Sequence, residues 1–171
     1  ATARARDQCV VLPLGCQLLH TLPARNLEEE NCCVEAYFQV GPAGDARSRA
    51  MIDLIDQLVQ EPAYNSLRTQ QQLGYTVHTG SRLTHGVLGF CFVVVSASHT
   101  PAYVETCIER FLVTYSEDKL AIMGVEELSQ QKAALAANKL QRDRALGDEG
   151  ARHWDHIWNE KYDFLAREVE V

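Results

Sequence analysis

The sequence lacks the long hydrophobic runs and the excess of basic residues that mark membrane proteins and nucleic-acid-binding proteins. Its longest apolar run, 90–95, has the length of a β-strand and falls far short of a bilayer span. Lys and Arg number 16 against 23 Asp and Glu, so the formal net charge is -7, and the basic residues form no continuous stripe. We therefore expect no membrane span and no nucleic-acid partner.

The sequence also lacks the pattern of a disulfide scaffold. No C-x-x-C pair occurs, and a chain of 171 residues can bury a core that needs no covalent staples. Residues 1–6 are small and basic, but the apolar segment of a secretory signal does not follow them. We therefore expect reduced thiols and a cytoplasmic location. The six cysteines are Cys9, Cys16, Cys32, Cys33, Cys91 and Cys107.

Complete catalytic motifs are absent as well. No histidines form the H-E-x-x-H or H-x-x-E-H patterns, and no G-x-S-x-G elbow or Gly-rich phosphate loop is present. The nearest approach to a metal site is His153 with His156 one turn later and Glu160 one turn beyond. We favour a solvated helix face, opposite Trp154 and Trp158, because a lone histidine pair is incomplete as a metal site. The chain is therefore expected to bind no metal of its own.

Hydrophobic periodicity predicts alternating strands and helices. Alternating apolar residues over 33–40 predict a half-buried strand, and three- and four-residue steps over 46–60 predict an amphipathic helix that Pro62 interrupts. A short second helix is expected around Leu67. The run 87–98 is apolar on both faces, which is typical of a central strand covered on both sides.

The remaining segments complete an α+β fold. A strand is expected over 75–79, and helices are expected from Pro101, over 125–146 and over 151–162. Two short apolar segments within 9–22, broken by Pro13 and Gly15, suggest a hairpin or an entry strand pair. This order predicts a mostly antiparallel sheet with helices packed on one face. The buried anchors expected on the last helix are Trp154, Ile157 and Trp158.

The most distinctive stretch is 67–75, where a helix gives way to a strand. Arg68 offers five fixed hydrogen-bond donors and Tyr75 offers one hydroxyl. Together they could bind the carbonyl groups of an extended peptide or stabilise an oxyanion. The alternative is that Arg68 pairs with a surface carboxylate and Tyr75 packs in the core. Composition alone favours this alternative.

The same stretch resembles a signature in the C-terminal half of the inverted-zincin metallopeptidases, the pitrilysin-type family of insulysin and nardilysin. The matching residues are Leu67-Arg68-Thr69 and Gln72-Leu73-Gly74-Tyr75, and the resemblance extends over roughly 31–164. Flanking matches lie at Glu61-Pro62, at 86–90 and at 162–164. The glutamines at 70–72 depart from the pattern, because relatives often carry Lys or Glu there.

The resemblance implies a domain within a larger enzyme. By this resemblance, each family member is built of four homologous α+β domains arranged in two halves. The two halves close around a chamber that holds the peptide. Zinc would be bound by another domain, in the N-terminal half, which would be the partner of this chain. Residues 31–171 would then form the non-zinc C-terminal domain, and residues 1–30 a hairpin or linker from the preceding domain.

The resemblance also implies roles for two residues. Arg68 and Tyr75 match the arginine and tyrosine that contact the substrate backbone near the scissile bond, so they would assist catalysis and substrate binding. The chain would be part of a zinc metalloendopeptidase that degrades peptides, and this segment alone would be inactive. The alternative is a catalytically inert scaffold, or a module that binds a peptide or docks a partner.

Overall fold

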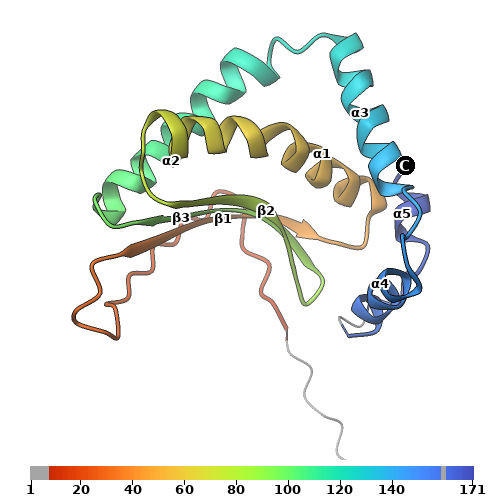
Figure 1. Cartoon of the computed structure of the whole chain (residues 1–171), viewed down its shortest axis with the longest axis horizontal. Coiled ribbons are helices and arrows are strands. Elements are labelled where there is room, and N and C mark those ends of the chain that lie inside the picture. Colours follow the sequence, from red (N-terminus) through yellow and green to blue (C-terminus); the bar gives the residue numbers. More distant parts are fainter. Residues whose placement is uncertain (1–7, 159–160) are drawn as a thin grey trace, which may run out of the picture.

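The structure, a computed structural model, describes residues 8–158 and 161–171. Its centre is a three-stranded antiparallel sheet in the order β1–β3–β2. Strand β1 spans Cys32–Pro42, β2 spans Thr76–Thr84 and β3 spans Val87–Ser96. Helices cover one face of this sheet, so the expected α+β class is confirmed (Figure 1).

Strand β3 is the central strand, as its apolar sequence predicts. It pairs with β1 along one edge and with β2 along the other. Phe90 and Phe92 belong to the core beneath the helices, with their ring centroids 5.4 Å apart. Cys91, which alternation directs to the opposite face, is also buried. Both faces of β3 are therefore covered.

Helix α1 spans Ala46–Ala63, and the carboxylate of Asp45 caps it by accepting two backbone N–H groups of its first turn. The expectation that Pro62 interrupts this helix is wrong. The chain continues without a break from α1 into the π-helical segment η1, Tyr64–Gln70, which carries the expected short helix around Leu67.

Tyr115 explains how α1 accommodates a proline. Pro62 has no N–H group for the carbonyl of Leu58, four residues earlier. Tyr115 ends helix α2, Pro101–Tyr115, and its hydroxyl donates a hydrogen bond to that carbonyl at 2.6 Å. Burial raises the pKa of the Tyr115 phenol, so the hydroxyl keeps its proton at neutral pH. A tertiary contact therefore supplies the donor that the sequence removes.

The hydrophobic core lies between the sheet and the layer formed by α1, η1 and α2. Helix α2 begins after Thr100, whose hydroxyl accepts a backbone N–H bond from the first turn. Cys107 packs in this core as a small apolar residue, as its place on the apolar helix face predicts. The most deeply buried members are Val59, Ala63, Leu67, Leu73, Phe92, Val94, Val104, Cys107 and Ile108.

Three more helices lie at one end of the sheet: α3 (Val125–Lys139), α4 (Leu146–Trp158) and α5 (Ala166–Val169) (Figure 1). Helix α3 ends, and α4 begins, earlier than the periodicity predicts. The carboxylate of Asp148 accepts the backbone N–H of Ala145 at 3.1 Å, which fixes the start of α4. Within the described residues, no helix combines the length and apolar character that crossing a bilayer requires.

The orientation of helix α4 is opposite to the one expected: the sequence predicts a buried tryptophan face and an exposed histidine face. Trp154 is 60% exposed and Trp158 is 74% exposed, so neither tryptophan is a buried anchor. His153 and His156 instead face inward and lie against the ring of Phe164, with centroid distances of 5.5 and 5.9 Å. The apolar stripe that the sequence suggests for core packing is thus directed outward.

An ion network holds the C-terminal segment against α1 and α3. The ammonium of Lys139 lies 2.5 Å from carboxylate oxygens of both Asp53 and Glu170. Arg49 pairs with Glu170 and, at 3.3 Å, with Asp163. Because Arg49, Lys139 and Glu170 are largely shielded from solvent, the network fixes three distant parts of the chain relative to one another.

The N-terminal segment differs from the expected hairpin. Residues 8–31 contain a turn at Gly15 and no strand among the described positions. The segment is attached to β1 through Gln39, whose amide accepts from the N–H of Leu12 at 2.6 Å and donates to the carbonyl of Val10 at 3.0 Å. The assignment of residues 1–30 to a preceding domain remains a prediction, and residues 1–7 lie outside the described part.

Candidate functional site

The candidate site is the junction between η1 and β2. Arg68 lies in the last turn of η1, and Tyr75 immediately precedes β2. Leu67 and Leu73 are fully buried on either side of the junction, and the N–H of Leu73 donates to the carbonyl of Leu67 at 3.0 Å. Two buried anchors therefore fix the ends of the turn that places Arg68 and Tyr75.

Glycine at position 74 permits the turn to sit directly on the sheet. A Cβ atom at Gly74 would lie only 1.9 Å from the backbone carbonyl oxygen of Val95 in β3. Gln72, just before, adopts a left-handed backbone with φ of 53°, which is uncommon for a residue that is not glycine. The signal for this close approach is visible in the sequence only as a glycine between Leu73 and Tyr75.

Arg68 and Tyr75 are brought together by this turn. The guanidinium carbon of Arg68 lies 5.5 Å from the centroid of the Tyr75 ring, within the range of a cation–π contact. Tyr75 is 87% exposed, so it does not pack in the core. The structure pairs Arg68 with no carboxylate of the described residues. The part of the alternative interpretation that packs Tyr75 in the core is therefore wrong, and the carboxylate partner expected for Arg68 is not found among the described residues.

The donors of Arg68 are incompletely used. Its Nε atom is buried and has no hydrogen-bond partner among the described residues. A buried donor without an acceptor costs free energy, so an unpaired one in a folded protein calls for an explanation, of which a functional role is one. The arginine thus contacts the Tyr75 ring, and the described residues leave its Nε donor unpaired.

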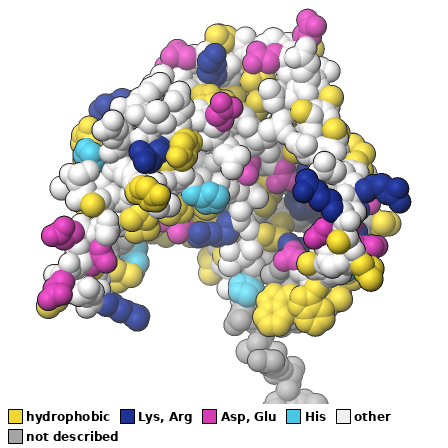
Figure 2. Space-filling model, viewed as in Figure 1, with side chains coloured by type: hydrophobic (Ala, Val, Ile, Leu, Met, Phe, Trp, Pro, Cys, Tyr) yellow, Lys and Arg dark blue, Asp and Glu magenta, His cyan; other side chains and the backbone are white. Residues whose placement is uncertain are grey.

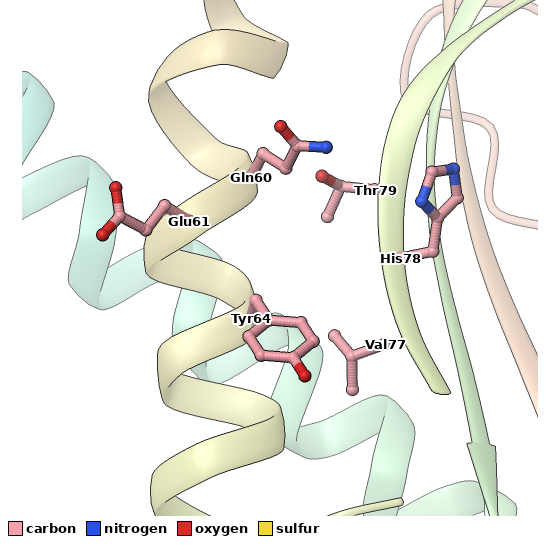
Figure 3. Close-up of a pocket in the computed structure, with 6 residues that line it drawn as sticks. All are labelled: Gln60, Glu61, Tyr64, Val77, His78 and Thr79. Atoms are coloured by element: carbon pink, nitrogen blue, oxygen red, sulfur yellow. The ribbon is translucent and has the colours of Figure 1, made fainter. Parts of the chain in front are cut away.

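A hollow of about 310 Å³ adjoins this junction between α1, η1 and β2. Figure 3 shows Gln60, Glu61 and Tyr64 on the helical side, with Val77 and Thr79 directed toward them from β2. The sequence alone offers no signal for this hollow, because its walls come from α1, η1 and β2, which become neighbours only in the folded protein. Its lining combines polar and apolar side chains.

One acidic group near the hollow has a perturbed pKa. Burial raises the pKa of Asp56 on α1, the nearby carboxylate of Asp53 raises it further, and the hydroxyl of Thr79, at 3.5 Å, opposes the rise. The contact joins the middle of α1 to β2. It therefore helps to fix the spacing between the two walls of the hollow.

The described residues contain no group of three His, Cys, Asp or Glu side chains that could hold a metal ion. His153 and His156 pack against Phe164, while Glu160, the third member of the alternative site, lies outside the described residues. The side chains present in this part of the chain do not fit a zinc site. That the chain binds no metal stays a prediction.

The cysteines form no catalytic pair with a histidine ring in the described chain. All six are free thiols. Cys32 comes close to a histidine in space, but its thiol donates to the backbone carbonyl of His99 at 3.2 Å. The imidazole of His99 stacks instead on Tyr103, with the centroids 5.1 Å apart. This geometry supplies no activated nucleophile.

Comparison with known proteins places the site in a family context. Residues 54–154, which include the whole junction, match the family model described as PQQ synthase PqqF-like, C-terminal lobe domain 4. The chain is 33% identical over 171 residues to a nardilysin-like protein of Arabidopsis thaliana, covering 98% of this chain and 17% of that protein. It is 33% identical over 147 residues to the insulin-degrading enzyme of Homo sapiens, covering 86% and 14% respectively.

Structural comparison agrees with the sequence matches. The fold is similar to a crystal structure of pitrilysin with a TM-score of 0.70 and 27% identity, covering 84% of this chain and 15% of that one. A proposed zinc protease of Schizosaccharomyces pombe is 28% identical over 173 residues. The chain spans between 14% and 18% of the length of these relatives.

Proposed function

Because this chain belongs to the pitrilysin-type family, as a PqqF-like C-terminal lobe domain, we propose that it is the non-zinc, substrate-contacting domain of a zinc metalloendopeptidase. The observation that carries the proposal is the pairing of Arg68 with the exposed Tyr75 on a rigid junction. Names of relatives such as insulin-degrading enzyme support peptides as the substrate class.

The two side chains suit the charge that develops during peptide hydrolysis. Attack on a peptide carbonyl places negative charge on its oxygen, and donors positioned beforehand stabilise that charge. The guanidinium of Arg68 supplies several N–H donors in a fixed fork, and the Tyr75 hydroxyl supplies one more. The cation–π contact keeps the two groups together before the substrate arrives, so less ordering is needed in the transition state.

Zinc belongs elsewhere in this proposal. The described side chains form no cluster fit for the ion, so the metal would be bound by the N-terminal half of the complete protein. That half would be the partner of this chain, and the substrate peptide would lie in a chamber between them. Free thiols at all six cysteines suit a reducing, cytoplasmic location.

The experiment that tests the proposal compares variants of the full-length protein. We expect Arg68→Ala and Tyr75→Phe each to lower kcat for a peptide substrate by about a hundredfold, the effect of removing one oxyanion donor. Gln70→Ala, at an exposed neighbouring position on η1, is the matched control and should retain activity. Unchanged hydrolysis by both site variants would refute the catalytic role.

An inert docking module is the second candidate, and one observation favours it. Hydrophobic side chains gather at the α4 end of the molecule, where Trp154 and Trp158 are exposed (Figure 2). Exposed aromatic residues of this kind often mark an interface. The upstream sequence discriminates between the candidates: an intact H-x-x-E-H motif supports the peptidase, and its loss supports the docking module.

A further inference from the structure

The open edge of β2 has the properties of a strand that accepts another strand. In the sheet order β1–β3–β2, β2 is bonded to β3 on one side only. Its register with β3 runs from Thr76 to Thr84 without a shift. Along its other edge, no strand of the described residues pairs with it.

The hairpin geometry identifies which backbone groups face this open edge. His85 and Gly86 form a two-residue turn with positive φ at both positions, so the residues flanking the turn bond to each other. Antiparallel pairing then alternates along the strand. The N–H and C=O groups of Val77, Thr79 and Ser81 are therefore directed away from β3 and toward the open edge.

The two edges of the sheet differ in the features that prevent another strand from pairing with them. On β1, the register shifts between Gln39 and Gly41, and the strand ends at Pro42. Bulges, prolines and covering segments are the usual means of preventing strand addition. Strand β2 has no proline and no bulge, so its edge remains a regular template.

Charge does not protect the β2 edge either. Arg82 is the one Lys or Arg in β2, and alternation places it on the face of the sheet away from the helices. There it pairs with Glu35 across the sheet, and its guanidinium carbon lies 5.7 Å from the centroid of the Tyr37 ring. These contacts direct the charge across the face of the sheet and leave the edge accessible.

The edge begins at the candidate site. Tyr75 immediately precedes β2, and the hollow lined by Gln60, Tyr64 and Val77 lies between the start of the edge and the helices (Figure 3). A chain added along β2 would therefore have its backbone on the strand, one side chain over the hollow and one end beside Arg68. This arrangement of edge strand and neighbouring helix is a common setting for peptide recognition.

We propose that the open edge of β2 binds the backbone of an extended peptide as an added strand, through Val77, Thr79 and Ser81. The inference rests on the proposed function, because it takes the substrate peptide as the occupant. It assigns a second role to the domain: backbone hydrogen bonds along β2 align the peptide, and Arg68 and Tyr75 meet it at one end.

The test uses Ser81, which is exposed at the edge. Ser81→Pro removes an outward N–H without removing a bond to β3, and proline is tolerated at such edge positions. Ser81→Ala is the matched control, because it retains the N–H. Full-length protein in chelator, which keeps the peptide uncleaved, is titrated with a fluorescein-labelled decapeptide rich in Thr and Val, and fluorescence anisotropy gives Kd.

We expect Ser81→Pro to raise Kd by about threefold to tenfold, the effect of one lost hydrogen bond, and Ser81→Ala to leave it within about twofold. Equal Kd values for the two folded variants would overturn the inference. If circular dichroism finds Ser81→Pro unfolded, the decapeptide with single N-methyl groups decides. If N-methylation weakens binding at every second amide of the decapeptide, strand addition is supported. If N-methylation has the same effect at every amide, strand addition is overturned; this is the result expected if another strand of the protein covers the edge.

The two proposals fail in different measurements. If Ser81→Pro raises Kd as expected but Arg68→Ala leaves kcat unchanged, the binding edge is retained and the catalytic role is rejected. A hundredfold loss of kcat in Arg68→Ala, together with no effect at position 81, would retain the catalytic role and reject the binding edge.

Discussion

The guanidinium of Arg68 lies over the ring of Tyr75, with 5.5 Å between the guanidinium carbon and the ring centroid. The turn between them is anchored by the buried side chains of Leu67 and Leu73 and lies against β3 at Gly74. Position, exposure and mutual contact of the pair are therefore set by the core, and the pair itself remains at the surface. Four predictions follow from the contacts that support it and from those that hold the domain together.

Lysine should not replace Arg68. A lysine keeps the positive charge but offers a point charge on a flexible stem in place of the planar fork that contacts both an aromatic face and a carbonyl. We expect Arg68→Lys to lower kcat/KM of the full-length protein by at least about tenfold. Steady-state kinetics on a peptide substrate measures this, and activity equal to the unmodified protein would contradict the need for the fork.

A methyl group at position 74 should displace the junction. The Cβ of Gly74→Ala would meet the carbonyl oxygen of Val95, a backbone atom that cannot rotate away. We expect a loss of about 1–3 kcal/mol in unfolding free energy, measured by chemical denaturation, and reduced activity because Tyr75 moves. The control is Gly44→Ala, where no atom lies within 4 Å of the added Cβ. Equal stability of both variants would contradict the close approach.

Removing the Tyr115 hydroxyl should leave the Leu58 carbonyl without the donor that compensates for Pro62. We expect Tyr115→Phe to lower the unfolding free energy by about 1 kcal/mol, the net contribution of one hydrogen bond. Tyr103→Phe is the control, because Tyr103 is 48% exposed. If the two variants unfold at the same denaturant concentration, the contact with Leu58 contributes nothing measurable.

The network around Glu170 should make stability depend on pH at both extremes. Burial alone would raise the pKa of Glu170, but hydrogen bonds from Arg49 and Lys139 lower it below its usual value. Its contribution is therefore complete above the ordinary carboxyl pKa and is lost as pH falls through the lowered value. Burial opposes the charge of Lys139, yet Asp53 and Glu170 raise its pKa, so that contribution is lost as pH rises through the raised value.

Glu170→Gln tests this pH dependence. It should lower the unfolding free energy near neutral pH by about 1–3 kcal/mol and flatten its decline in acid. Denaturant titrations between neutral pH and acid pH measure both effects. An acid profile that is identical in the variant and the original chain would contradict the assignment of this decline to Glu170.

Much of the fold was predictable because its signals are local. The alternation in β1, the apolar periodicity of α1 and the doubly apolar run of β3 each depend on neighbouring residues alone, and all three are confirmed. One error arose where a distant partner decides the outcome, and another where a nearby capping side chain does. Pro62 fails to end α1 because Tyr115 donates to Leu58. Helix α4 begins early because Asp148 accepts the N–H of Ala145.

The sequence by itself determined the α+β class, the order of the main elements and the resemblance carried by 67–75, because periodicity and motif spacing are properties of the chain alone. Only the tertiary structure decided that Arg68 contacts Tyr75, that Gly74 lies against Val95, and that the β2 edge stays open beside a hollow. The physical reason is that these features depend on the packing of β2, β3 and α1 against one another. Periodicity gives the faces of each element but not their relative positions.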